Sequence, residues 1–165
     1  MIDVIVGIDP GLTGAIAVIS VNPITCVAVH DIPTILSRNE TKKVTDLSSL
    51  SKIIREISTE YRVLAVLIEL VASRPDQGVV SVFSFGFGTG LLHGVCAANG
   101  LKIAEISPAV WKADLNLTRN KADSLHLAKK IFPESAKSFE KMKHNGRAEA
   151  ALIAYFGIKF MGKKK

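Results

Sequence analysis

Residues 4–14 read VIVGIDPGLTG, an apolar run that ends in a carboxylate and a Pro-Gly turn. An unbroken run of Val, Ile and Gly is typical of a central strand that is covered on both faces. Asp9 therefore stands at the end of a buried strand, where an anion needs hydrogen bonds, a cation or a metal ion. Because Asp is also a common turn residue, a simple turn cap is the alternative interpretation.

Two more carboxylates stand in comparable places. Residues 63–68 read VLAVLI, and this second apolar run ends in Glu69. Near the C-terminus, Glu149 begins a helical stripe that is expected to pack on the sheet and that ends at Phe160. Three acids that meet at one site repel each other in a low dielectric, and a divalent cation relieves this repulsion. Oxygen ligands alone favour Mg²⁺ or Mn²⁺ over zinc.

The spacing of apolar residues predicts an α/β protein with a five-stranded sheet. An antiparallel meander of three strands is expected near residues 2–8, 14–20 and 24–31, and two further strands end near residues 69 and 106. Helices are expected over residues 47–57 and 79–98, from Ser107-Pro108 onwards, and over 119–131 and 147–160. No shift in composition divides the chain, so we expect one domain over residues 1–160 and a basic tail at 161–165.

The charge of the chain favours a polyanionic partner. Lys and Arg number 21 against 15 Asp and Glu, which gives a formal net charge of +6. Because several acids are predicted to lie in an interior site, the outer surface is more basic than this total. Solvated helix faces are the alternative interpretation of any one lysine. The basic residues concentrate in the C-terminal half, at Lys102, Lys112, Arg119, Lys121, Lys129, Lys130, Lys137, Lys141, Lys143 and Arg147.

The sequence also gives an expectation about location. The chain does not open with a charged and apolar leader, and no continuous apolar run reaches about 18 residues, the length that spans a bilayer. We therefore expect a soluble protein of the cytoplasm with no membrane partner. Cys26 and Cys96 are isolated, without the spacing of metal ligands, and are interpreted as small core residues.

Four motifs in order resemble the ribonuclease H-like nucleases and, within them, the RuvC family of Holliday junction resolvases. They are Gly7-Ile8-Asp9-Pro10-Gly11 with Thr13-Gly14, Ile68-Glu69, residues 107–112 (SPAVWK) and residues 147–154 (RAEAALIA). The resemblance covers nearly the whole chain and is closest to phage-encoded members. It implies a ribonuclease H-like fold, with a three-strand meander plus two parallel strands flanked by helices. It also implies a homodimer that cuts four-way or branched DNA.

The resemblance assigns roles to named residues. Asp9, Glu69 and Glu149 would hold two Mg²⁺ ions, with Mn²⁺ as a substitute, and Asp9 would bridge them. Lys112 and Lys121 match basic positions of the family near the scissile strand, where they would neutralise phosphate or developing charge. A solvated lysine is the alternative for Lys112. The residues expected to contact DNA are Lys112, Arg119, Lys121, Lys143 and Arg147.

The fourth metal ligand departs from the family pattern. Members usually carry an acid, or sometimes a His, about one helical turn before the last carboxylate, whereas this chain has Asn145 and Gly146 there. An amide oxygen can bind a hard cation but adds no negative charge, so either Asn145 or the neighbouring His144 is the candidate ligand. Alternatively, Asn145-Gly146 is only a turn pair at the start of the last helix.

A second departure concerns aromatic residues. Cellular relatives carry an aromatic side chain shortly after the second acid, associated with opening the junction, but residues 70–73 read LVAS. Phe83, Phe85 and Phe87 are interpreted as residues of helix packing or of a dimer interface, rather than as residues that stack on DNA bases. Trp111 is likewise interpreted as a packing residue rather than a stacking one.

Two rival functions follow from the same residues. Residues 9–14 also resemble the first phosphate loop of actin-like ATPases and sugar kinases, but those enzymes clamp their nucleotide between two such domains and this chain offers one. The other rival is a junction-binding protein whose catalytic site is impaired at Asn145.

Overall fold

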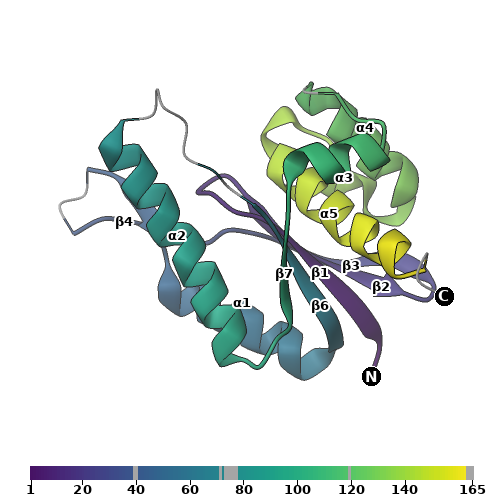
Figure 1. Cartoon of the computed structure of the whole chain (residues 1–165), viewed down its shortest axis with the longest axis horizontal. Coiled ribbons are helices and arrows are strands. Elements are labelled where there is room, and N and C mark those ends of the chain that lie inside the picture. The colour runs from purple at the N-terminus through teal and green to yellow at the C-terminus, as the bar shows by residue number, and fades with distance from the viewer. Residues whose placement is uncertain (39–40, 71, 73–77, 119, 163–165) are drawn as a thin grey trace.

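A central sheet separates two layers of helices (Figure 1). The computed structural model describes residues 1–165 except 39–40, 71, 73–77, 119 and 163–165. The strand order is β3-β2-β1-β6-β7, with β1 and β2 antiparallel, β2 and β3 antiparallel, and β6 and β7 parallel to their neighbours. The five strands are β1 (Asp3–Asp9), β2 (Ala15–Val21), β3 (Ile24–Asp31), β6 (Arg62–Glu69) and β7 (Ile103–Ile106). The predicted mixed sheet is confirmed.

The helices cover both faces of this sheet (Figure 1). On one face lie α1 (Leu47–Glu60) and α2 (Val79–Ala98). The other face carries α3 (Pro108–Asp114), α4 (Lys121–Ile131) and α5 (Asn145–Gly162), together with the 3₁₀ segments η1 (Pro133–Phe139) and η2 (Met142–His144). Helix α5 begins two residues earlier than predicted, so Asn145 and Gly146 are part of the helix.

A two-stranded hairpin, β4 (Thr34–Leu36) and β5 (Lys43–Thr45), was not anticipated. Each strand is three residues long, too short for an alternating pattern to be recognised in the sequence. The hairpin leads directly into α1, whose N-cap Asp46 accepts hydrogen bonds from the backbone N–H groups of Ser48 (3.1 Å) and Ser49 (3.2 Å).

Alternation along β1 divides its side chains between two cores. Val4, Val6 and Ile8 belong to the core under α1 and α2. Ile5 belongs to the core under α5, and Asp9 follows it on the same face because strand side chains repeat every second residue. The acid at the end of β1 therefore faces the layer that holds α5.

Glycine in β1 lets α5 lie directly on the strand. A Cβ atom added at Gly7 would lie 2.0 Å from the carbonyl oxygen of Ala150 and 2.6 Å from the backbone nitrogen of Ala154. Real Cβ atoms do not approach backbone so closely, so no larger residue fits here without moving the helix. The first turns of α5 are thereby held beside the C-terminal end of β1.

Helix α2 is largely uncovered. Its buried residues are Leu92, Val95 and Cys96, all in its C-terminal half. By length and composition it could cross a membrane: its mean hydropathy is 1.6, and only 17% of its most apolar 18-residue stretch is buried in the protein. The prediction based on continuous apolar runs missed this property, because Gly, Ser, Thr and His interrupt the apolar residues of α2.

Candidate active site

Three carboxylates meet at the C-terminal edge of the sheet. Strands β1 and β6 are parallel and pair Ile8 with Ile68, so Asp9 and Glu69 end neighbouring strands on the same face. Glu149 comes from the second turn of α5, which packs on that face. One ligand atom from each of the three carboxylates lies within 4.8 Å of the others. The structure thus brings together the three acids singled out in the sequence.

Burial and neighbouring charges change the proton affinity of two of these acids, Asp9 and Glu69. Burial, followed by the charges of Glu149 and Glu69, raises the pKa of Asp9 from 3.8 to about 8, although Lys112 and Lys121 act in the opposite direction. Burial also raises the pKa of Glu69. The site therefore holds more negative charge than the surrounding groups compensate, which is the condition under which carboxylates bind a cation.

Helices α3 and α4 each deliver a side chain to Glu149, Lys112 from α3 and Ser124 from α4. Ser107 precedes the helix and Pro108 occupies its first turn, as the sequence predicted. The ammonium of Lys112 lies 2.9 Å from Oε1 of Glu149, and the Ser124 hydroxyl donates a hydrogen bond of 3.4 Å to the same oxygen. Lys112 is therefore a cation in the site rather than a solvated surface residue.

Trp111 has a role that the sequence did not reveal. The side chain is fully buried, which confirms packing over base stacking, and its indole N–H donates a hydrogen bond of 2.9 Å to Oε1 of Glu69. The Lys112 ammonium lies 5.1 Å from the centre of the same ring. A buried indole N–H needs an acceptor, and this requirement was the available clue. The hydrogen bond lowers the pKa of Glu69 against the effect of burial.

The position expected to hold a fourth ligand is occupied by small and neutral groups. A Cβ atom added at Gly146 would lie 2.5 Å from the carbonyl oxygen of Thr13 and 3.0 Å from Oδ2 of Asp9, so this position requires glycine. The Asn145 side chain donates a hydrogen bond of 3.2 Å to the carbonyl oxygen of Lys121. A metal-binding role for Asn145 stays a prediction.

His144 is buried beside the start of α5. Its Nδ1 accepts a hydrogen bond of 3.3 Å from the backbone N–H of Lys141. Burial and then the positive charges of Arg147, Lys143 and Lys141 lower the pKa of His144, which favours its neutral form. His144 is not part of the close group formed by the three acids, and its role as a ligand also stays a prediction.

The residues expected to contact DNA differ in how available they are. Lys121 begins α4, is exposed, and lowers the pKa of Asp9, while Lys143 is exposed next to α5. Arg147 instead forms two hydrogen bonds of 2.6 Å to the carboxylate of Asp31 in β3. This ion pair ties α5 to the sheet, so Arg147 has a structural partner already. Arg119 lies outside the described residues.

The donor set suits a hard divalent cation. Asp9, Glu69 and Glu149 offer oxygen atoms only, from three elements whose positions the packing of α5 on β1 fixes. A bound cation would offset the repulsion between the carboxylates, which together with burial raises the pKa of Asp9 to about 8. The residues present therefore fit the predicted Mg²⁺ or Mn²⁺.

Comparison with solved structures identifies the architecture. RuvC of Thermus thermophilus in complex with a Holliday junction substrate superposes with a TM-score of 0.66 at 15% identity over 95% of each chain. Thermus thermophilus RuvC by itself gives 0.63 at 18% identity over 96% of each chain. The chain has the RuvC fold. A fowlpox virus resolvase in complex with a substrate Holliday junction also matches, with a TM-score of 0.54 at 14% identity over 94% of this chain and 99% of that one.

Sequence comparison adds a further relative. The chloroplastic Holliday junction resolvase MOC1 of Chlamydomonas reinhardtii is 29% identical over 93 residues, 55% of this chain and 10% of that protein. The chain thus spans about a tenth of the curated relative's length. No model of a known protein family matches the chain. The predicted resemblance to RuvC is confirmed for the fold, and the closer likeness to phage-encoded members stays a prediction.

Proposed function

We propose that this protein is a structure-selective endonuclease that resolves Holliday junctions and other branched DNA by metal-assisted hydrolysis of phosphodiesters. One observation carries the proposal: three carboxylates within 4.8 Å of one another at the end of the central strands of a RuvC fold. The names of the similar proteins, all of them resolvases or RuvC, support the same substrate.

Asp9, Glu69 and Glu149 would hold two Mg²⁺ ions, with Mn²⁺ as a substitute. When bound, these cations would supply activation of a water molecule and stabilisation of the leaving 3′ oxygen. Trp111 holds Glu69 in place through its indole N–H. A cation at Glu149 would compete with the ammonium of Lys112, which lies within reach of a phosphate at the same site.

The DNA would cross the basic surface around this site. The chain carries a formal net charge of +6, and the exposed Lys121 and Lys143 flank the start of α5. Phosphates neutralised by lysine release counterions, so affinity would fall steeply with salt. A loss of positive charge at Lys121 should reduce this salt dependence.

Cleavage of a labelled four-way junction tests the proposal. The wild type should cut with Mg²⁺ and not with excess chelator, and Asp9→Asn or Glu69→Gln should abolish cutting while junction binding persists in Ca²⁺. Glu56→Gln, an exposed acid on α1, is the matched control and should cut normally. Full activity in chelator or in both site variants would contradict the metal assignment. Binding without any cutting by the wild type would favour the impaired junction-binding protein.

We further infer that the protein forms a homodimer through α2. Phe83 and Phe87 are 73% and 60% exposed, and their rings stack with centroids 6.4 Å apart. Beside them, Cβ atoms added at Gly86, Gly90 or Gly94 would meet nothing within 4 Å, so the helix backbone is open to close approach. An exposed apolar stripe of this kind on one helix suits a second copy related by a two-fold axis.

Sedimentation analysis tests the dimer. The double variant Phe83→Lys with Phe87→Lys places like charges opposite each other across a two-fold interface and should sediment as a monomer. Thr59→Lys, at an exposed position of α1, should sediment like the wild type. A monomeric wild type, or a double variant that still dimerises, would place the contact elsewhere.

A further inference from the structure

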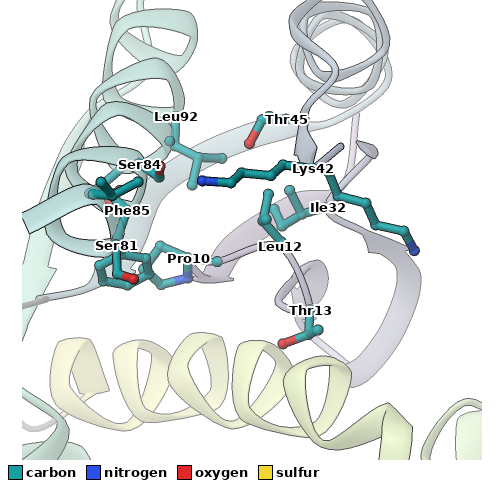
Figure 2. Close-up of a pocket in the computed structure, with 15 residues that line it drawn as sticks. Pro10, Leu12, Thr13, Ile32, Lys42, Thr45, Ser81, Ser84, Phe85 and Leu92 are labelled. Carbon is teal, nitrogen blue, oxygen red and sulfur yellow. Dashed lines mark hydrogen bonds between the residues drawn. The ribbon is translucent and has the colours of Figure 1, made fainter. Parts of the chain in front are cut away.

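A pocket of about 640 Å³ lies beside the acidic site, on the side of α2 (Figure 2). Most of its lining comes from three segments: the turn after β1, the β4–β5 hairpin and residues 80–92 of α2. None of these segments contributed to the predicted DNA-binding surface, which lies in the C-terminal half of the chain.

The pocket and the acidic site share one wall. Asp9 ends β1, and the next four residues, 10–13, line the pocket. From the opposite side, Gly146 of α5 packs so closely that an added Cβ atom would lie 2.5 Å from the carbonyl oxygen of Thr13. Figure 2 shows this turn between the pocket and α5, with the Thr13 side chain directed to the helix. Only the thickness of one turn separates the pocket from Asp9.

The pocket offers apolar surface, including the aromatic ring of Phe85. Ile32 and Leu92 are almost fully buried, at 4% and 1% exposure, and Pro10, Leu12 and Phe85 add further apolar surface. The turn lies against α2, since a Cβ atom added at Gly11 would be in ordinary contact with the ring of Phe85, at 3.5 Å. Stacking on an aromatic ring, here that of Phe85, is a common way in which proteins hold unpaired bases.

Polar groups at the pocket carry the charge that an anionic ligand needs. Lys42 and Lys43 line it from the β4–β5 hairpin, and no Asp or Glu occurs among the described residues that line it. The hydroxyl groups of Thr45, Ser81 and Ser84 stand around the same space (Figure 2). Hydroxyl groups can donate to or accept from the edge of a base, and lysines pair with its phosphate.

We propose that this pocket receives one unpaired nucleobase of the DNA strand whose phosphate lies at the acidic site. The proposal rests on the proposed function and adds to it a site that selects which nucleotide flanks the cut. The volume suits a base with its sugar, since small-molecule sites span about 300–1,000 Å³. A purely apolar peptide would leave both lysines without a complementary charge.

A fluorescent base tests the pocket directly. Four-way junctions that carry 2-aminopurine at successive positions around the cleavage site are mixed with the protein in Ca²⁺, and fluorescence reports unstacking of the labelled base. We expect brightening of several-fold at one position with the wild type. Ser84→Phe and, as a second variant, Gly88→Val fill the pocket from α2 and should abolish the brightening. Thr59→Phe on α1 is the matched control and should retain it.

The charged rim is tested in parallel. Lys42→Ala with Lys43→Ala should weaken junction binding by about tenfold, whereas Lys52→Ala on α1 should not. Junction binding and Mg²⁺-dependent cleavage by the wild type are measured on the same samples, because their failure would remove the proposed function itself. Normal binding without brightening at any position, or brightening that persists in both pocket-filling variants, would overturn the pocket. Binding of free deoxynucleotides that Ser84→Phe abolishes, without base unstacking in DNA, would also overturn it.

Discussion

Helices α5 and α2 are both long and apolar, yet α5 is largely buried in the protein and α2 is largely exposed. Ten residues of the 18 in α5 are buried, whereas three of the 20 in α2 are. Helix α2 has the higher mean hydropathy of the two by composition, with neither Asp, Glu, Lys nor Arg in its sequence. Apolar composition alone therefore does not tell which helix is the core and which offers a surface.

The surroundings of the glycines differ between α5 and α2 in the same way as the burial of the two helices. On the α5 side, Gly7 and Gly146 mark places where backbone meets backbone, at added-Cβ distances of 2.0 and 2.5 Å. On α2, Gly86, Gly90 and Gly94 face open space. The first two glycines set the spacing of the acidic site, while the other three leave room for a partner.

Gly7→Ala should produce the largest effect and tests the rigid half of this comparison. Its Cβ atom must push α5 from β1, which should cost about 3 kcal/mol of unfolding free energy and separate Glu149 from Asp9. Chemical denaturation measures the loss. Gly94→Ala on α2, in dilute protein, should instead gain about 0.5–1 kcal/mol from helix propensity. Equal effects of the two variants would show that the helices do not differ as described.

Stability as a function of pH tests the raised pKa of Asp9, to which Glu149 of α5 contributes. Asp9 keeps its proton to about pH 8 in the folded chain, whereas the unfolded chain releases it near pH 3.8. The folded state thus binds more protons between these values, and the stability contributed by this group falls as pH rises from about 4 to about 8. Thermal unfolding without metal should show this decline. Asp9→Asn should flatten the curve, and added Mg²⁺ should raise stability most at the alkaline end.

Trp111→Phe tests whether metal binding needs the hydrogen bond from the buried Trp111 to Glu69. The ring volume is largely kept but the hydrogen bond to Glu69 is lost, so affinity for the metal should fall by about tenfold. Calorimetric titration with Mn²⁺ measures this, and thermal unfolding reports whether packing is kept. A lower melting temperature with unchanged metal affinity would make Trp111 a packing residue only.

Asn145→Asp should give the smallest effect, because Asn145 is only partly buried and its side chain is hydrogen-bonded to the carbonyl oxygen of Lys121. Added negative charge one turn before Glu149 should lower the Mg²⁺ concentration for half-maximal cleavage by about two- to fivefold. His144→Ala is made alongside. If Asn145→Asp has no effect and His144→Ala abolishes cleavage, His144 is the fourth ligand and the preference for Asn145 is wrong.

The sequence allowed prediction of those parts of the architecture that depend on patterns of neighbouring residues. Two apolar runs that end in Asp9 and Glu69 predict adjacent buried strands with acids at one edge, and helical spacing places Glu149 on the packed face. The Ser107-Pro108 pair predicted the start of α3. Each of these inferences needs only neighbouring residues, and each agrees with the structure.

Contacts between distant segments could not be predicted in this way. The bond from Trp111 to Glu69 joins residues 42 apart, and the ion pair of Arg147 with Asp31 joins residues 116 apart. Hydropathy also left open whether α2 is covered, because burial depends on what packs against a helix and not on the helix itself.

The hydrogen bond between Trp111 and Glu69 gives the protein an intrinsic optical probe. Trp111 is the sole tryptophan of the chain and its indole nitrogen lies 2.9 Å from a predicted metal ligand. Its emission should respond to any cation that engages Glu69, and paramagnetic Mn²⁺ should quench it where Mg²⁺ only shifts it. Occupancy of the acidic site can thus be followed in real time, without label, DNA or turnover.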